Sequence, residues 1–289
     1  MLEPNLYHLK YFVDAATLNS VGAAAKKNSV SQPAVSQGIK KLEEALGVEL
    51  LVHNKNRFKL SHEGELVLVK FKEILSVFQN LRDELTEKQE EVSGQVSLGT
   101  MRSLALHFLP RIFKELKEQY PKLTPVMKIA MSKVVAEQVK RGQIELGLVS
   151  DDSNLDGLQA ELVYEGAFRC VLGAEHKSQA SHLGFLVTEE RPGLLEIQKF
   201  YKKKHKKEAD ITMVIQSWEV ITRMALEGLG IGVIPDFIAN SYRQGEFIYL
   251  YPDFAPKYRI YLIHCGRKQL SRHAKIVLDQ FSATVFDAR

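Results

Sequence analysis

The stretch Ser20–Leu46, SVGAAAKKNSVSQPAVSQGIKKLEEAL, predicts two short helices joined by a tight polar turn. The first helix is expected from Val21 to about Lys27, and the turn is residues 28–30. Ser31 stands at the N-cap of the second helix, where its hydroxyl can accept a free backbone N–H. Pro33 follows in the first turn, where a missing N–H is tolerated.

The second helix of this stretch has two different faces. Its apolar stripe has helical spacing and comprises Val35, Ile39, Leu42 and Leu46. Its polar face comprises Gln32, Ser36, Gln37, Lys40 and Lys41. Short polar side chains suit base edges and lysines suit phosphates. The pattern predicts a helix-turn-helix whose second helix enters the major groove. The alternative for this stretch alone is a helical hairpin with a solvated polar face.

The flanking segments extend this prediction. Before the stretch, one apolar helical face is formed by Leu6, Leu9, Val13 and Ala16, and this helix should pack behind the helix-turn-helix. After the C-cap glycine Gly47, two extended runs around a basic turn predict a β-hairpin wing. The side chains expected to reach phosphates or the minor groove are Lys55, Arg57 and Lys59. The alternative is an ordinary surface hairpin.

A long helix is expected from about residue 63 to residue 91, roughly 44 Å at about 1.5 Å per residue. Its heptad seam comprises Val67, Phe71, Ile74, Phe78, Leu81 and Leu85, with Lys88 interrupting it before Val92. Such a seam predicts a partner helix, and packing on the chain's own core is the alternative. Residues 1–62 carry a net charge of +3 and residues 63–93 one of −4. A basic lobe followed by an acidic helix fits a DNA-facing domain and a solvated connector.

Composition bounds the class of protein. The chain has 289 residues, 45% hydrophobic and 26% charged, which is ordinary for a globular protein. No apolar run approaches the roughly 18 residues of a membrane helix, and the start lacks the pattern of a signal peptide. With only two cysteines, no disulfide framework is expected. We interpret the protein as cytoplasmic, without a membrane partner.

After an expected hinge at Val92–Gly94, the pattern changes to alternating strands and helices, which predicts βαβ units and a mostly parallel sheet. Strands are expected at 95–99, 125–131, 144–149, 158–164, 168–172, 182–187, 211–215, before Pro235 and at 259–264. Helices are expected at 103–119, 133–140, 194–206, 217–227 and 272–285. The fold class is therefore α/β with several domains.

Ligands of open α/β sheets bind beyond the carboxyl ends of strands, near helix N-termini. The residues at such points are Thr100, Met101, Arg102, Ser103, Ser132, Gln216, Ser217 and Trp218. Hydroxyls, helix N-termini and Arg102 suit a carboxylate or phosphate. The alternative is that the hydroxyl residues only cap helices. Trp218 stacks on a ligand or serves as packing.

The sequence resembles the LysR-type family of bacterial transcriptional regulators over essentially the whole chain. The resemblance is carried above all by residues 30–36, VSQPAVS, and also by LKYF at 9–12, IKKLE at 39–43, LSHEG at 60–64, GQIELG at 142–147 and EGLGIGVIP at 227–235. The sequence departs from the family pattern at Gly38, at residues 19–22, at Glu145 and in the lysine-rich segment between Val187 and Ile211. Gly38 is expected to cost about 1 kcal/mol of helix propensity and to remove a DNA contact.

The resemblance implies a winged helix-turn-helix at residues 1–62, a linker and dimerisation helix with hinge at 63–93, and an effector-binding domain at 94–289 that is similar to a type II periplasmic binding protein. Its subdomain I would be about 94–165 and 266–289, and its subdomain II about 166–265. The implied partners are double-stranded DNA with an inverted repeat, a small metabolite held near Thr100, Ser132 and Ser217, and a second copy of the chain. A dimer of dimers, a homotetramer, is the family expectation, and RNA polymerase is a candidate partner.

Several features remain outside this function. Cys170 and Cys265 are expected on two neighbouring crossover strands, as buried thiols or, alternatively, as a redox switch. The nine histidines show no metal-ligand spacing, and no cofactor is expected. The basic run 202–207 is interpreted as a solvated helix end, with an anion patch as the alternative. No nucleophile elbow, Gly-rich phosphate loop or carboxylate pair with a base predicts an enzyme. A sensor module whose helix-turn-helix serves only protein contacts is the second alternative.

Overall fold

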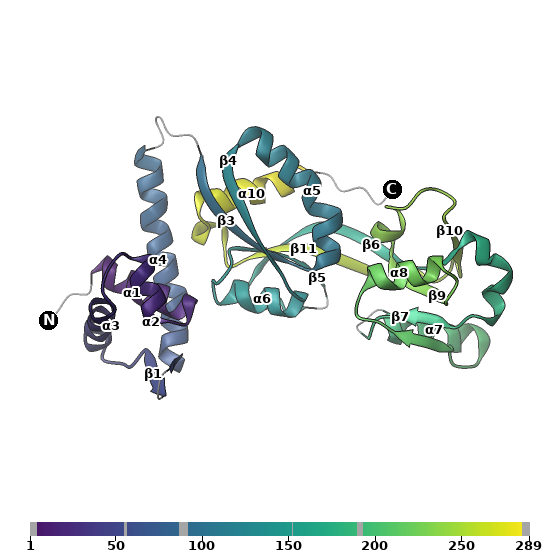
Figure 1. Cartoon of the computed structure of the whole chain (residues 1–289), viewed down its shortest axis with the longest axis horizontal. Helices are drawn as coiled ribbons and strands as arrows, with labels where there is room; N and C mark the ends of the chain where they lie inside the picture. Colours follow the sequence, from purple (N-terminus) through teal and green to yellow (C-terminus); the bar gives the residue numbers. More distant parts are fainter. Residues whose placement is uncertain (1–4, 55–56, 87–91, 152, 190–192, 285–289) are drawn as a thin grey trace.

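The computed structural model describes residues 5–54, 57–86, 92–151, 153–189 and 193–284. A small N-terminal helical unit, one long helix and a two-lobed α/β domain follow one another along the chain (Figure 1). The N-terminal unit consists of α1 Leu6–Leu18, α2 Val21–Lys27, α3 Gln32–Leu46, β1 Leu51–Asn54 and β2 Arg57–Leu60. Within the described residues, no helix is long and apolar enough to cross a membrane.

Local capping explains where the first three helices begin. The side chains of Asn5, Ser20 and Ser31 each accept the backbone N–H three residues further on. These bonds satisfy N–H groups that have no partner inside the helix. At the other end, Gly47 ends α3 with a φ of 72°, which a glycine adopts without steric cost. The predicted helix-turn-helix and its boundaries are therefore confirmed.

The core of the N-terminal unit differs from the predicted apolar faces. On α1, Phe12 and Ala15 are fully buried, whereas Leu6 is exposed. The ring of Phe12 meets Phe71 of the long helix edge-on, with centroids 5.8 Å apart. The predicted face of α1 was therefore wrong in part, because the long helix covers a neighbouring side of α1.

The end of the apolar stripe on α3 was also predicted wrongly. Leu46 is 41% exposed. The chain turns back at Gly47, and Glu43 accepts the N–H groups of Leu50 and Leu51 at 2.8 and 3.1 Å. Leu50 is consequently fully buried, and it fills the core at this end in place of Leu46.

Gly38 faces the core and not the exposed surface of α3. It is buried, and a Cβ atom added here would lie 2.8 Å from the ring of Tyr11 and 3.2 Å from that of His8. The expectation that this glycine removes a DNA contact was therefore wrong. Gly38 instead allows α1 and α3 to approach each other closely, which offsets its helix-propensity cost of about 1 kcal/mol.

The long helix, α4 His62–Thr86, has 25 residues and is about 37 Å long. Its first half packs against the N-terminal unit, where Leu68 and Phe71 are buried. The alternative of packing on the chain's own core is correct for this half. Further along, Ile74, Phe78 and Leu81 are 46%, 45% and 49% exposed. The expected continuation of the helix over residues 87–91 lies outside the described residues.

The two-lobed domain is built on one nine-stranded sheet with the order β4-β3-β5-β11-β6-β9-β7-β8, with β10 paired to β6. Its strands are β3 Ser93–Thr100, β4 Lys122–Ile129, β5 Leu146–Ser150, β6 Gln159–Gly173, β7 Phe185–Val187, β8 Ile211–Val214, β9 Ile231–Pro235, β10 Phe247–Leu250 and β11 Lys257–His264. Its α-helices are α5 Arg102–Gln119, α6 Ser132–Lys140, α7 Gly193–His205, α8 Trp218–Leu226, α9 Asp236–Ala239 and α10 Arg272–Ala283. Short 3₁₀ helices are η1 Ala174–His182 and η2 Arg267–Gln269.

Each lobe has parallel strands, and antiparallel strands join the lobes. β3 pairs parallel with β4 and β5 in lobe I, and β7 pairs parallel with β8 and β9 in lobe II. β6 and β11 pair antiparallel with each other and connect the lobes (Figure 1). The predicted α/β fold is confirmed, but the expectation of a mostly parallel sheet holds only within each lobe.

Several predicted boundaries were wrong, among them the start of the strand expected at 182–187, since η1 extends to His182 and β7 begins at Phe185. Ser93 and Gly94 belong to β3, where they pair with β4, so they are not part of a hinge. The two strands expected at 158–164 and 168–172 are one continuous strand, β6. The chain returns to lobe I at the start of β11 and not near Gly266, because β11 pairs with β5 from Ile260 onward. Two antiparallel crossover strands pass the junction side by side, so the return lies opposite residues 166–167.

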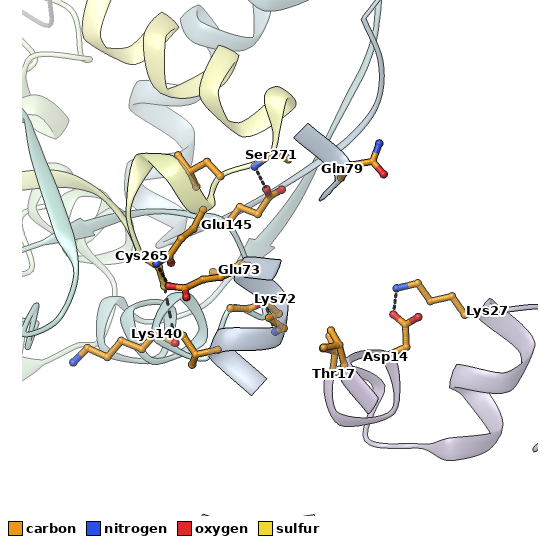
Figure 2. Close-up of a pocket in the computed structure, with 16 residues that line it drawn as sticks. Asp14, Thr17, Lys27, Lys72, Glu73, Gln79, Lys140, Glu145, Cys265 and Ser271 are labelled. Atoms are coloured by element: carbon orange, nitrogen blue, oxygen red, sulfur yellow. Dashed lines mark hydrogen bonds and ion pairs between the residues drawn. The ribbon is translucent and has the colours of Figure 1, made fainter. Parts of the chain in front are cut away.

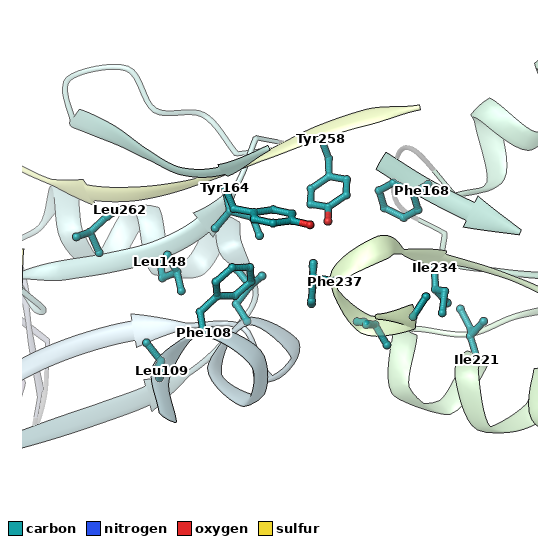
Figure 3. Close-up of a cluster of buried hydrophobic side chains, with 14 of the residues drawn as sticks. Phe108, Leu109, Leu148, Tyr164, Phe168, Ile221, Ile234, Phe237, Tyr258 and Leu262 are labelled. Carbon is teal, nitrogen blue, oxygen red and sulfur yellow. The ribbon is translucent and has the colours of Figure 1, made fainter. Parts of the chain in front are cut away.

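A buried carboxylate lies where the two crossover strands meet α9. Asp236 accepts hydrogen bonds from the hydroxyls of Tyr258 and Tyr164, at 2.5 and 3.1 Å, and from the N–H of Ala167 at 2.7 Å. Burial, together with this carboxylate, raises the pKa of both tyrosines. Around it, aromatic rings from both lobes pack together, among them Phe108 and Phe237 with centroids 5.3 Å apart (Figure 3). This cluster joins the two lobes.

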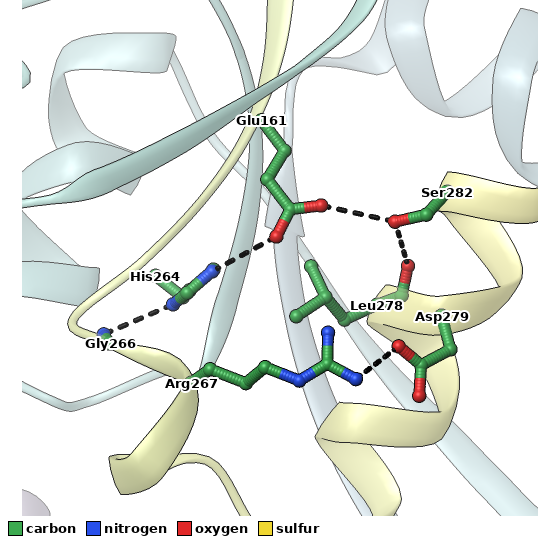
Figure 4. A network of polar contacts seen from close by, with 7 residues as sticks. All are labelled: Glu161, His264, Gly266, Arg267, Leu278, Asp279 and Ser282. Atoms are coloured by element: carbon green, nitrogen blue, oxygen red, sulfur yellow. Dashed lines mark hydrogen bonds and ion pairs between the residues drawn. The ribbon is translucent and has the colours of Figure 1, made fainter.

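A polar network closes the other end of lobe I (Figure 4). Glu161 on β6 accepts the hydroxyl proton of Ser282 on α10 at 3.0 Å. Its other oxygen lies 3.6 Å from Nε2 of the buried His264, while Gly266 N–H donates to Nδ1 of that ring. Burial lowers the pKa of His264. Glu161 thus links the buried His264, at the end of β11, to α10.

Candidate functional site

The predicted polar face of α3 is presented to solvent. Its exposed residues are Ser31, Gln32, Pro33, Ser36, Gln37 and Lys40. Lys41 is less exposed than these residues and lies near α1. Burial of His8 on α1, together with the positive charge of Lys41, lowers the pKa of His8. The polar side chains at the N-terminal end of α3 come first and the lysines follow one turn on. This face can therefore approach the edges of bases with its first turns and phosphates with its third.

The predicted wing is an antiparallel hairpin of β1 and β2 with Val52 paired to Lys59. Phe58 is buried in the core of the N-terminal unit and Lys59 is exposed, because neighbouring strand residues point to opposite faces. Arg57 is the first residue of β2. Lys55 lies outside the described residues.

A cavity of about 360 Å³ lies between the two lobes. Five of the predicted effector-binding residues line it, namely Met101, Arg102, Ser103, Ser217 and Trp218. They come from the N-terminal ends of α5 in lobe I and α8 in lobe II. Gln216 lines it too. The structure thus brings together residues that are more than one hundred positions apart in the sequence.

Two predicted residues do not line this cavity. Thr100 is fully buried and its hydroxyl donates to the carbonyl oxygen of Leu148 at 2.9 Å. Ser132 is buried, and its hydroxyl oxygen accepts the N–H of Ser150 at 3.2 Å. The N-caps of α5 and α6 are instead Met101 and Met131. Neither the cleft nor the cap prediction holds for Thr100 and Ser132, since both hydroxyls hold β5 to its neighbours. Ser217 does cap α8.

Sequence reasoning missed several residues of the cleft: Ile129, Ala130, Met131, Thr188, Glu189 and Glu219. Thr188 and Glu189 directly follow β7, and Ala130 and Met131 directly follow β4. The rule that selected Thr100 also applies to both strands, because both are parallel strands that end at this edge. The signal was therefore present in the sequence. Glu219, in the first turn of α8, carries no comparable signal.

A second cavity, of about 330 Å³, lies between α1, α4 and lobe I (Figure 2). Here Lys72 of α4 donates to the carbonyl oxygens of Arg141, at 2.8 Å, and of Gly142. These carbonyls follow the C-terminal end of α6, where a cation is favourable. Burial lowers the pKa of Lys72 to about 8. Since the N-terminal end of α6 lies at the cleft, α6 connects the cleft to α4.

The remaining sequence features have structural explanations. Cys170 lies on the lobe II part of β6. Cys265 directly follows His264, the last residue of β11, which pairs with Gln159 at the start of β6. The two are therefore about 11 residues apart along β6, roughly 35 Å, which excludes a disulfide within the chain. The two crossover strands are neighbours, as expected, but Cys170 and Cys265 lie at distant points along them, Cys265 directly after the end of β11. Burial raises the pKa of both thiols. Lys202–Lys207 are exposed at the end of α7, as predicted for a solvated helix end.

An exposed helix-turn-helix joined by a long helix to a two-lobed, cleft-bearing domain is an architecture of bacterial DNA-binding regulators. Residues 6–65 match the family described as "Bacterial regulatory helix-turn-helix protein, lysR family", and residues 89–285 match "LysR substrate binding domain". The chain belongs to the LysR family.

Individual relatives agree with this assignment. The HTH-type transcriptional regulator TdcA of Escherichia coli strain K12 is 28% identical over 170 residues, 58% of this chain and 54% of TdcA. The chain spans about half the length of such curated relatives. A full-length OxyR variant of Pseudomonas aeruginosa has a TM-score of 0.75 at 20% identity, covering 99% of this chain and 100% of that one. LysG of Corynebacterium glutamicum, with bound effector Arg, has a TM-score of 0.70 at 16% identity, covering 98% and 100%. These structures share the fold.

Proposed function

We propose that the protein is a sequence-specific DNA-binding regulator of transcription that responds to a small metabolite. The observation that carries this proposal is the exposed face of α3, which begins at the Ser31 cap and presents Gln32, Ser36 and Gln37 together. The family match over residues 6–65 supports it.

The side chains of this surface fall into two roles. Gln32, Ser36 and Gln37 read base edges, because glutamine and serine can both donate and accept hydrogen bonds in the major groove. Charged side chains hold phosphates, which fixes the register on the duplex without reading sequence. This second group comprises Lys40, Lys41, Lys55, Arg57 and Lys59.

The protein acts as a dimer whose α4 helices pair through the exposed part of the seam. Ile74, Phe78 and Leu81 are large apolar side chains at heptad spacing, and each is nearly half exposed in the single chain. Pairing would remove this surface from water. A homotetramer and contact with RNA polymerase follow from the family resemblance alone.

The effector binds in the cleft between the lobes. The cleft joins both lobes, contains Arg102 and Trp218, and has the size of a small-metabolite site. LysG, which shares the fold, holds its effector Arg.

Selection of bound DNA from a random pool by the purified full-length protein tests the proposal. We expect enrichment of an inverted repeat with half-sites whole helical turns of about 10 bp apart. A protein that enriches no sequence, and whose binding is lost steeply as salt rises, would contact only phosphates. That result would contradict the proposed function.

A further inference from the structure

The two walls of the cleft carry opposite charge. In lobe I, Arg102 is exposed at the start of α5, and no described residue forms an ion pair with it. The N-caps of α5 and α6, Met101 and Met131, both line the cleft, and neither side chain accepts a capping hydrogen bond. Two uncapped helix N-termini and a guanidinium therefore make this wall electropositive.

The wall in lobe II carries two carboxylates, Glu189 after β7 and Glu219 in the first turn of α8. One oxygen of Glu219 accepts the hydroxyl proton of Ser217 at 2.9 Å. Its other oxygen, Oε1, is buried and has no hydrogen-bond partner among the described residues. An unpaired buried carboxylate oxygen is costly, because it has lost its contact with water.

The adjacent Trp218 leaves a second buried atom without a partner in the described part of the chain, its indole Nε1–H. Its ring is held edge-on against Phe168 and Phe237, with centroids 5.8 and 6.2 Å apart. An unsatisfied donor and an unsatisfied acceptor thus lie on consecutive residues of one cleft wall. A ligand in the cleft that reached both atoms would need an acceptor for the indole N–H and a donor for the carboxylate oxygen.

We propose that the effector is a zwitterion of the α-amino acid class. Its carboxylate pairs with Arg102 and its ammonium group with Glu219 and Glu189, so that the ligand bridges the two lobes. Its side chain lies against the apolar part of the lining, which includes Ile129, Met101 and Met131. This inference rests on the proposed function and specifies the ligand of the same cleft.

Ligands of a single charge fit this arrangement less well. A simple anion that pairs with Arg102 would leave two carboxylates uncompensated on the opposite wall. A simple cation that pairs with the carboxylates would leave Arg102 and two helix N-termini unpaired. Burying an unpaired charge disfavours either complex.

The test measures thermal stabilisation of the full-length protein by a mixture of the twenty L-α-amino acids at millimolar concentration, followed by each singly. For every amino acid that stabilises, the amine lacking the carboxylate and the acid lacking the amino group are compared by calorimetry. We expect the amino acid to bind at least about tenfold more tightly than both analogues. If none of the twenty stabilises, or if the acid alone binds equally well, the inference is wrong.

Substitutions then locate the two charges. Arg102→Gln and Glu219→Gln should each weaken binding of the amino acid by about 10- to 100-fold. Lys114→Gln on α5 and Glu227→Gln at the end of α8 remove the same charges outside the cleft, and they should leave binding unchanged. Both cleft variants could instead lower the melting temperature of the ligand-free protein and leave amino-acid binding unchanged. In that case Arg102 and Glu219 stabilise the protein by attracting each other across the cleft, and the inference is wrong.

DNA selection on the same preparation separates this inference from the proposed function. If the protein selects an operator but binds no amino acid, the inferred class of ligand is wrong and the proposed DNA-binding function still stands. If the protein binds an amino acid but selects no DNA sequence, the inferred class of ligand is supported and the proposed DNA-binding function is contradicted.

Discussion

At the scale of single residues, the roles proposed for α3 separate the reading of sequence from the binding of phosphates. Gln37→Ala should lose about 1–3 kcal/mol of discrimination at one base position and keep its salt dependence, because the contact proposed for this uncharged side chain is with a base edge alone. Lys40→Ala should weaken binding to all sequences and lower the slope of log affinity against log salt by about one. Fluorescence anisotropy with an operator and single-base variants, at several salt concentrations, measures both.

Lys114→Ala, which removes an exposed charge from α5 in the other domain, is the matched control for Lys40→Ala. A Lys40→Ala protein with an unchanged salt slope would show that this lysine does not contact a phosphate.

At the scale of elements, one part of the α4 seam is buried within the chain and another part is exposed, where we propose that it pairs in a dimer. Phe71 belongs to the core of the N-terminal unit, whereas Phe78 is exposed. Phe78→Asp should weaken the dimer by about 2–4 kcal/mol, because pairing would bury an uncompensated carboxylate. Sedimentation equilibrium measures this change. Leu66→Asp, at an exposed position of α4 off the seam, should leave the dimer unchanged. Equal dimerisation of both variants would mean that α4 does not pair through this stripe.

The contact between α4 and the end of α6 has a distinct pH dependence. Burial lowers the pKa of Lys72 to about 8, against a usual value of 10.5. Between these pH values the unfolded chain holds a proton that the folded chain has lost, so this group makes the unfolding free energy rise with pH. Lys72→Met should therefore lack this rise, seen as a difference from wild type that grows between pH 8 and about 10.5 in urea titrations.

Lys70→Met is the matched control, since Lys70 is an exposed neighbour on α4 whose amine pairs with Glu73 at 3.1 Å. If Lys70→Met and Lys72→Met have the same pH dependence, Lys72 keeps its ordinary pKa.

At the scale of the whole molecule, the two lobes are held together at Asp236. Among the described residues, the three hydrogen bonds to its carboxylate come from donors on the crossover strands β6 and β11. Asp236→Asn would place an amide donor against one of these donors and should lower the unfolding free energy by about 2–4 kcal/mol. Urea denaturation measures this loss. Asp253→Asn, at an exposed carboxylate that pairs with Lys204, should change stability by less than about 1 kcal/mol. Equal losses in both variants would show that the buried network adds nothing.

The sequence by itself determined the features that depend on neighbours along the chain. The caps Ser31 and Gly47, the boundaries of α2 and α3, the polar face of α3 and the alternation of strands and helices could all be predicted, because capping and periodicity act over a few residues. Six of the eight residues predicted at strand ends and helix N-termini line the cleft, because the carboxyl ends of parallel strands meet at one edge of a sheet.

Only the tertiary structure decided which side chains face each other across the fold. Gly38 turned out to meet Tyr11, and the hydroxyl of Thr100 turned out to bond Leu148. The return of the chain at β11 depends on the register with β6, and the charges of Glu219 and Arg102 become opposed only when the lobes are placed. Such contacts join residues far apart in sequence, and the local pattern around each residue is compatible with several partners.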